Sequence, residues 1–124
     1  MKAILLSIKP QYVNQILEGN KKYEYRKSLA KKKCDTILIY SSSPVKKIVA
    51  SAKIDNTISD SPTSLWEKTK KYSGICYSDF MEYFQYREIA HAYKLSSIHI
   101  FETPFELKDF GIKTAPQSFL YVEI

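Results

Sequence analysis

The stretch Gly19-Asn-Lys-Lys-Tyr-Glu-Tyr-Arg26 combines a glycine with an alternating run of charged and aromatic residues. Gly19 lets the chain leave a helix in a backbone conformation that a side chain would oppose. Lys21 lies at the start of the following strand, where its ammonium group can meet a phosphate or a carbonyl oxygen. Glu24 and Arg26 are two residues apart, so they share one face of that strand and can pair or hold a common ligand.

The segments outside this octapeptide predict an α+β fold. Pro10 and Pro62 fit first helical turns, and Ser61 and Ser78 fit N-caps. Thr103-Pro-Phe-Glu106 has the spacing of a capping box for a short helix that ends at Gly111. Alternating and continuous apolar runs predict strands over residues 3–8, 21–27, 36–41, 46–55, 89–101 and 119–123, and helices over 10–18, 62–71 and 78–85. We therefore expect residues 1–124 to form a single domain, a small, largely antiparallel mixed β-barrel with flanking helices.

Charge is distributed unevenly along the chain. The net charge is +6, and residues 1–34 hold nine basic and two acidic side chains, so this first quarter carries the whole surplus. Such asymmetry favours a polyanionic partner, nucleic acid before membrane. The alternative is a solvated basic surface that only keeps the protein in solution. We expect Lys21, Lys22, Arg26 and Lys27 near one mouth, with Lys31–Lys33 extending that face as a track for a nucleic-acid backbone.

Other features argue against export and metal binding. The apolar run Ala3–Ile8 is too short for a signal sequence or a membrane span. Cys34 and Cys76 stand alone, and His91 and His99 have no carboxylate or cysteine at ligand spacing. We therefore expect a cytoplasmic protein with reduced thiols, no metal and no cofactor.

The octapeptide resembles the signature of the ASCH domain, G-x-K-x-x-E-x-R, with every specified position filled. The resemblance continues through Tyr40-Ser-Ser-Ser-Pro44, Leu65-Trp-Glu-Lys-Thr-Lys70 and Ala115-Pro-Gln-Ser-Phe119, so it covers nearly the whole chain. It implies a PUA-like fold, in which a helix lies beside a cleft at the first helix and second strand. Members of this family are proposed to bind RNA or nucleotides in that cleft, and a few small ones are reported to hydrolyse acylated cytidine or RNA.

The expected binding site gathers around the signature and two loops. A serine-rich turn offers hydroxyl and N–H groups to an anion, and the segment before the last strand offers groups that read a base edge. The expected ligand-binding residues are Lys9, Lys21, Glu24, Arg26, Tyr40, Ser42, Ser43, Gln117 and Ser118. For each of them an ordinary structural role is the alternative: a solvated Glu–Arg pair, a plain turn or a core tyrosine.

Catalysis at the signature would use Lys21 and Glu24. The acylcytidine hydrolases of the family have a threonine nucleophile three residues after the lysine, and this chain has Glu24 there. Glu24 would act as a general base for water while Lys21 polarises a carbonyl or phosphoryl oxygen. Candidates for a second carboxylate are Glu67, Glu82 and Glu102. The sequence thus favours an RNA- or nucleotide-binding module with a basic cleft, regulatory in RNA metabolism. A hydrolase of a modified nucleoside or a ribonuclease ranks second, and a protein-interaction module third.

Overall fold

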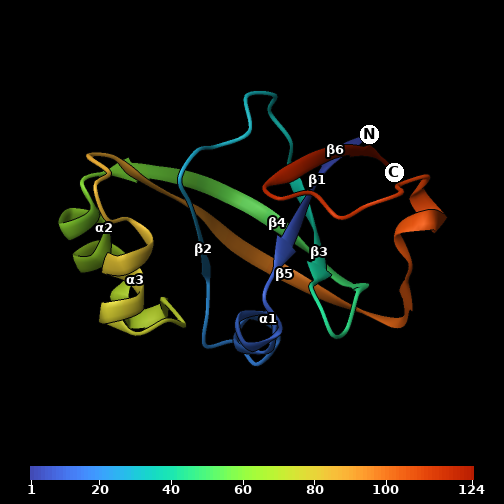
Figure 1. Ribbon diagram of the computed structural model, residues 1–124, viewed down its shortest axis with the longest axis horizontal. Coiled ribbons are helices and arrows are strands. Elements are labelled where there is room, and N and C mark those ends of the chain that lie inside the picture. The colour runs from blue at the N-terminus through green and yellow to red at the C-terminus, as the bar shows by residue number, and fades with distance from the viewer.

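The computed structural model describes residues 1–124 as one six-stranded sheet with three α-helices (Figure 1). The strands are β1 (Lys2–Ile8), β2 (Tyr23–Arg26), β3 (Thr36–Ser41), β4 (Lys47–Asp60), β5 (Ala90–Phe105) and β6 (Phe119–Glu123). The helices are α1 (Pro10–Leu17), α2 (Pro62–Thr69) and α3 (Tyr77–Tyr83), and short 3₁₀ helices cover Lys70–Tyr72 and Leu107–Phe110. The predicted α+β class is confirmed, and every predicted strand and helix has a counterpart.

The strands follow the order β2-β5-β4-β3-β1-β6 across the sheet. Only the β1–β3 pair is parallel, and the other neighbouring strands are antiparallel. Since β2 and β6 are edge strands, backbone hydrogen bonds do not close the sheet into the expected barrel. Arg26 on β2 nevertheless donates a hydrogen bond from Nη2 to the carbonyl oxygen of Ser7 on β1, at 2.9 Å. The sheet therefore curls until β2 approaches strands from its other end.

Both faces of the sheet are covered, because successive side chains of a strand point to opposite sides. On one side Leu6 of β1 packs in a cluster with Val13 and Ile16 of α1. On the other side Leu5 packs in a second cluster with Tyr40 of β3. Strand β1 is thus buried on both faces, and its contacts on one of them place α1 beside the start of β2.

A third cluster holds α2 and α3 at the end of the sheet that carries β2 (Figure 1). Leu65 of α2 and Phe80 and Phe84 of α3 are buried against Tyr25 of β2. The Tyr25 ring makes edge contacts with both phenylalanines, at centroid distances of 4.8 and 6.2 Å. Burial of these large side chains stabilises the position of α3 opposite α1, with β2 between them.

The long central hairpin differs from its prediction. Strand β4 extends to Asp60 rather than to residue 55, and β5 is one continuous strand from Ala90 to Phe105. The two strands pair along their length with three register shifts, and Ser97 adopts a positive φ of 50° at one of them. Because such bulges absorb an extra residue without ending the ladder, the positive φ at Ser97 does not terminate the strand.

Two predicted helix caps are also corrected. Thr103 and Pro104 belong to β5, and the short helix that follows is capped by Glu106, whose backbone N–H donates to Asp109 Oδ2 at 2.8 Å. Strand pairing between Ile48 and Phe105 takes up the residues on which the predicted cap depended. Helix α3 begins at Tyr77, so the predicted cap Ser78 lies inside its first turn. The predicted N-cap at Ser61 is confirmed by a 3.3 Å bond from the Ser64 N–H.

Candidate functional site

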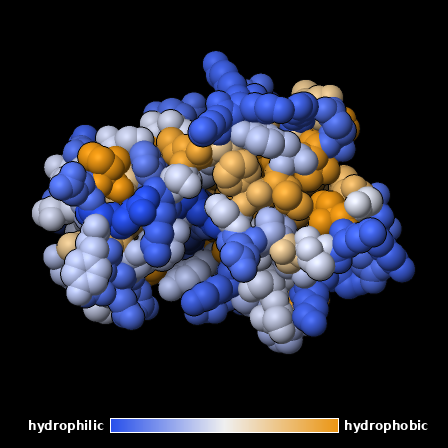
Figure 2. Space-filling model, turned by 45° about the horizontal axis from the view of Figure 1, so that its top comes forward, coloured by the Kyte–Doolittle hydropathy of each residue, from blue (hydrophilic) through white to orange (hydrophobic).

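A cleft of about 580 Å³ lies between α1, β2 and α3. Figure 2 shows the surface hollowed beside the part of the molecule formed by α2 and α3. The cleft lies where the first helix and second strand meet, as the resemblance implied. Its lining comprises Ser7, Ile8, Lys9, Gln11, Tyr12, Lys21, Glu24, Tyr25, Arg26, Lys27, Ile75, Asp79, Glu82 and Tyr83.

Lys21 lies at the floor of this cleft, with only 3 % of its surface exposed. Gly19 has a φ of 86° and ends α1 as predicted, and the Lys21 backbone N–H then donates to the Gln15 carbonyl at 3.1 Å. The side chain runs inward, and Nζ donates to the Ser73 carbonyl at 2.7 Å. Neighbouring segments therefore hold both the backbone of Lys21 and the end of its side chain.

Gly74 lets the Lys21 side chain reach this position. A Cβ atom at Gly74 would lie 2.3 Å from Lys21 Cβ and 2.7 Å from its Cγ, closer than van der Waals contact permits. Gly74 also has a φ of 63°, a conformation that side chains rarely adopt. The packing of Gly74 against Lys21 had no signal in the sequence, because the two residues are far apart along the chain.

Burial changes the acid–base behaviour of Lys21. Desolvation lowers the pKa of Lys21 to about 8, although the nearby Glu24 carboxylate opposes this effect. Nζ lies 4.0 Å from Glu24 Oε1 and 4.7 Å from the centre of the Tyr25 ring, so its charge is only partly compensated. A buried, incompletely paired cation in a cleft is typical of a functional site.

Glu24 and Arg26 form a tight and largely buried pair. Glu24 Oε2 accepts from Arg26 Nε at 3.1 Å and from Nη2 at 2.8 Å, and the side chains are only 9 % and 12 % exposed. The alternative of a pair on a solvated strand face is therefore wrong. Arg26 also donates to the carbonyl oxygens of Ser7 at 2.9 Å and Ser118 at 3.4 Å. These four hydrogen bonds use most of the five N–H groups of a guanidinium, so Arg26 orients Glu24.

Tyr25 supports the floor through a short hydrogen-bonded chain. Its hydroxyl lies 2.6 Å from Thr69 Oγ1, and Thr69 donates its single hydroxyl proton to the Leu65 carbonyl at 2.8 Å. Tyr25 is therefore the donor to Thr69. Burial raises the pKa of Tyr25 to about 12, so its phenol stays neutral beside the Lys21 ammonium.

The other expected ligand residues are more scattered. Lys9 lines the cleft, and Ser118 is tied to it through Arg26. Tyr40 is buried in the second core cluster, outside the cleft, because its face of β3 packs under the C-terminal part of the chain. Ser42 and Ser43 lie in the turn after β3, and Gln117 is exposed before β6; none of these three lines the cleft. The turn adjoins the cleft without lining it, since the Ser42 backbone N–H donates to the carbonyl of the lining residue Ile8 at 2.9 Å.

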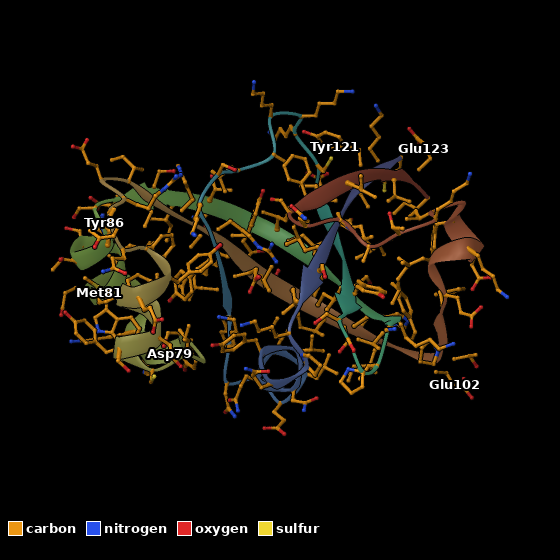
Figure 3. All side chains as sticks on the ribbon, in the orientation of Figure 1. Asp79, Met81, Tyr86, Glu102, Tyr121 and Glu123 are labelled. Carbon is orange, nitrogen blue, oxygen red and sulfur yellow. The ribbon has the colours of Figure 1, made fainter.

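Helix α3 brings two carboxylates that change the charge of the cleft. Glu82 was one of three candidates for a second carboxylate, whereas Asp79 was not expected. Figure 3 shows Asp79 on α3, and it shows Glu102, another of the candidates, at the opposite end of the molecule. Glu67 pairs with Lys70 on the surface. Asp79, Glu82 and Tyr83 recur at helical spacing on a face of α3 next to the buried Phe80 and Phe84, and this spacing was the available signal. The lining thus holds four cationic and three anionic side chains and is close to charge balance: Lys9, Lys21, Arg26 and Lys27 against Glu24, Asp79 and Glu82.

Of the two other lysines expected near the mouth, Lys27 lines the cleft and Lys22 does not. Lys22 packs its ammonium over the Tyr72 ring at 4.2 Å. Lys31–Lys33 line a separate hollow of about 510 Å³ on the other side of the loop between β2 and β3. No group of three or more histidine, cysteine or acidic side chains is arranged to hold a metal ion. None of the helices is long and apolar enough to cross a membrane.

The fold and the signature site together define a PUA-like domain. The model of the ASCH domain family matches residues 6–104, and this protein belongs to that family, which is often linked to RNA binding. The structure is similar to the ASCH protein of Zymomonas mobilis, with a TM-score of 0.89, 21 % identity and coverage of 98 % of this chain and 87 % of that one. A tyrosine-to-phenylalanine variant of the same protein gives a TM-score of 0.90 at 22 % identity, covering 99 % and 91 % of the two chains.

Two proteins of Ureaplasma parvum are similar in sequence. ATP synthase subunit alpha is 26 % identical over 97 % of this chain, and large ribosomal subunit protein uL22 is 23 % identical over 97 %. The chain spans only 15 % and 39 % of the lengths of these two proteins. The similarity therefore concerns a segment of each.

Proposed function

We propose that this protein binds RNA or a nucleotide in the cleft between α1, β2 and α3, as a module of RNA metabolism. The observation that carries the proposal is the buried ammonium group of Lys21 at the cleft floor. Its nearest carboxylate oxygen is 4.0 Å away, too far for a direct hydrogen bond. A phosphate or carbonyl oxygen of a ligand would complete its partners and offset its desolvation.

The remaining lining suits a nucleotide. The cleft volume of about 580 Å³ falls in the range of small-molecule sites. Tyr12 and Tyr83 offer rings for stacking, and the exposed Lys9 and Lys27 offer charges to a phosphate. Carboxylates in the wall accept hydrogen bonds from the amino groups of bases. Since the charges of the cleft nearly balance, this mode of binding relies on shape and hydrogen bonds more than on net charge.

We assign ligand contacts to the groups whose hydrogen-bonding capacity is not already used within the protein. Lys21 and Glu24 Oε1 face the cleft, and both are ligand contacts in this proposal. Arg26 is occupied by Glu24 and two carbonyl oxygens, so we assign it to positioning Glu24. This assignment replaces the expectation that Arg26 contacts the ligand itself.

Isothermal titration of nucleoside monophosphates and short single-stranded RNA tests the proposal. Lys21→Met keeps the length of the side chain and removes its charge, and we expect affinity to fall by about 1–3 kcal/mol, the value of a charge-assisted hydrogen bond. Lys53→Met, an exposed lysine of β4 outside the cleft, is the matched control and should bind as the parent does. Unchanged binding by Lys21→Met would exclude the cleft as the site.

A hydrolase is the second candidate, favoured by the placement of Glu24 beside Lys21 with Asp79 and Glu82 in the same cleft. Glu24 would take a proton from water while Lys21 stabilises the developing oxyanion. The assay is hydrolysis of acylated cytidine and of short RNA. Glu24→Gln should abolish turnover and leave binding nearly intact, since an amide cannot accept the proton. Absence of turnover by the parent, together with binding that depends on Lys21, would leave the binding module; absence of both would favour a protein-interaction module.

A further inference from the structure

Four lysines outside the cleft form a second charged surface. Lys31, Lys32 and Lys33 follow one another in the loop between β2 and β3, and Lys2 begins the neighbouring strand β1; we call these four residues the lysine surface. All four are exposed and none forms an ion pair. Figure 2 shows hydrophilic side chains gathered over this loop and the adjoining end of β1. These residues supply four of the nine basic side chains of residues 1–34, and the charges of the cleft nearly cancel once Asp79 and Glu82 are counted.

The loop that carries three of these lysines is held in place by the sheet. The Tyr93 hydroxyl on β5 accepts from the Ala30 backbone N–H at 2.8 Å, and the Tyr121 hydroxyl on β6 accepts from that of Lys32, also at 2.8 Å. The Lys32 ammonium lies 5.3 Å from the centre of the Tyr121 ring, and Figure 3 shows Tyr121 next to this loop. A loop whose backbone is already held loses less conformational freedom when a ligand binds, so this anchoring favours binding.

Like charges are brought together on this surface, and none of them forms an ion pair with a carboxylate. The Lys2 ammonium lies close to that of Lys32 and repels it, which lowers the pKa of Lys32. The acidic groups that face the adjoining hollow are Asp35 and Asp55, and Asp55 is engaged with Ser96. An anion that lies across two adjacent ammonium groups offsets the repulsion between them, since they have no carboxylate partner of their own.

We propose that the lysine surface binds the phosphate backbone of a single-stranded RNA whose neighbouring nucleotide occupies the cleft. The path between the two is short, because Lys27 lines the cleft and Lys31 follows four residues later, at most about 14 Å of extended chain. Tyr121 adds an aromatic ring beside the lysines, a combination that single-stranded nucleic acids use. This inference rests on the proposed function for the occupant of the cleft. It adds that the ligand is a strand rather than a free nucleotide.

The test compares two triple variants of equal charge change. Lys31→Ser, Lys32→Ser and Lys33→Ser together remove the loop charges, and Lys53→Ser, Lys71→Ser and Lys113→Ser remove three exposed charges elsewhere that form no ion pair. Fluorescence anisotropy follows a labelled single-stranded RNA of about a dozen nucleotides at several salt concentrations, and titration follows a nucleoside monophosphate.

We expect the loop variant to lower the slope of log affinity against log salt by about 2, since each single-strand phosphate contributes about 0.7. RNA affinity at low salt should fall by about tenfold or more. Binding of the monophosphate should be unchanged, and the control variant should retain most of the parental slope. Equal slopes for the two triple variants, or an unchanged loop variant, would overturn the inference.

Two further outcomes separate this inference from the proposed function and from a membrane partner. If the parent binds RNA with the loop-dependent slope but binds no monophosphate, the cleft proposal fails and the lysine surface stands. If monophosphate binding depends on Lys21 while RNA binding is unaffected by the loop substitutions, the cleft proposal is supported and the inference about the lysine surface fails. Loop-dependent binding to vesicles of phosphatidylserine and phosphatidylcholine, with RNA binding unaffected, would assign this surface to anionic lipid and overturn the RNA assignment.

Discussion

The cleft and the lysine surface use positive charge in opposite ways. In the cleft Lys21 is buried and Arg26 is largely buried, and both lie against the Glu24 carboxylate and are held by backbone carbonyl oxygens. On the lysine surface the ammonium groups are exposed and unpaired. Buried charges act over short distances in a medium of low dielectric constant, whereas exposed ones act collectively and are screened by salt. The first arrangement suits recognition of one chemical group, and the second suits attraction of a polyanion.

This difference has a measurable energetic consequence. Substitutions in the cleft should change stability strongly, because they leave a buried partner without its counterpart. Substitutions on the lysine surface should change stability little and affect mainly salt-dependent binding. Lysines that look alike in the sequence are therefore expected to fall into two classes.

The largest expected effect is on Arg26. Arg26→Met leaves Glu24 and the Ser7 carbonyl without their donor, and the free energy of unfolding should fall by about 3–5 kcal/mol, as for other broken buried ion pairs. Lys68→Met, which breaks an exposed pair with Asp60, is the control and should cost less than about 1 kcal/mol. Urea denaturation measures both. Adding Glu24→Leu to Arg26→Met should recover part of the loss, and a cost near that of the control would mean that the pair is effectively solvated.

A smaller effect is expected at Gly74. Gly74→Ala combines a strained positive φ with overlap against the Lys21 stem, so we expect a loss of about 3 kcal/mol. Gly19→Ala has the same backbone problem but nothing within 4 Å of the new methyl group, and should cost about 1 kcal/mol. The difference in unfolding free energy isolates the crowding of Lys21. Equal losses at the two glycines would show that Lys21 moves aside freely.

The third prediction concerns pH. Lys21 has a native pKa of about 8, below its ordinary value of 10.5, so between these values the unfolded chain binds a proton that the native protein has released. Stability from this group therefore rises with pH in that window, and the cost of burying the charge is fully present below pH 8. Relative to Lys21→Met, the parent should gain about 2 kcal/mol between pH 7 and pH 10.

Urea titrations of both proteins at each pH give this difference, and contributions that the two share cancel. Measurements stop at pH 10, because the raised pKa of Tyr25, about 12, lowers native stability above that pH in both proteins. A stability difference that does not change with pH would mean that Lys21 keeps an ordinary pKa.

Local patterns predicted most of the fold because they depend on few residues. Pro10, Ser61 and the glycine at position 19 each act through backbone geometry, and the structure has them in the expected roles. The errors arise where pairing between distant strands overrides a local signal. Thr103 had the spacing of a cap, but the β4–β5 ladder extends the strand through it.

The site was predictable only where its residues are close in sequence. Glu24 and Arg26 share a strand face by periodicity, and their contact follows from that spacing. The packing of Gly74 on Lys21 and the approach of Asp79 to the cleft depend on how α3 and the segment before it return to β2. The charge balance of the cleft has the same origin, since half a chain separates its cations from two of its carboxylates.

The smallest expected effects come from two tyrosine hydroxyls, one in each region. Tyr25→Phe removes the donor to the buried Thr69 Oγ1 and should cost about 1–2 kcal/mol. Tyr121→Phe removes the acceptor of the exposed Lys32 N–H, which water can replace, and should cost less than about 0.5 kcal/mol. Thermal melting gives the two stabilities, and amide hydrogen exchange reports on Lys32 directly.

Exchange at Lys32 should become faster in Tyr121→Phe and stay unchanged in Tyr25→Phe, because only Tyr121→Phe releases the loop. If Lys32 exchanges at the same rate in both variants, Tyr121 does not order the loop and the lysine surface loses its anchor. If Tyr121→Phe instead lowers the free energy of unfolding as much as Tyr25→Phe does, the loop is part of the cooperative core. The contrast between a buried site and an exposed charged surface would then be wrong.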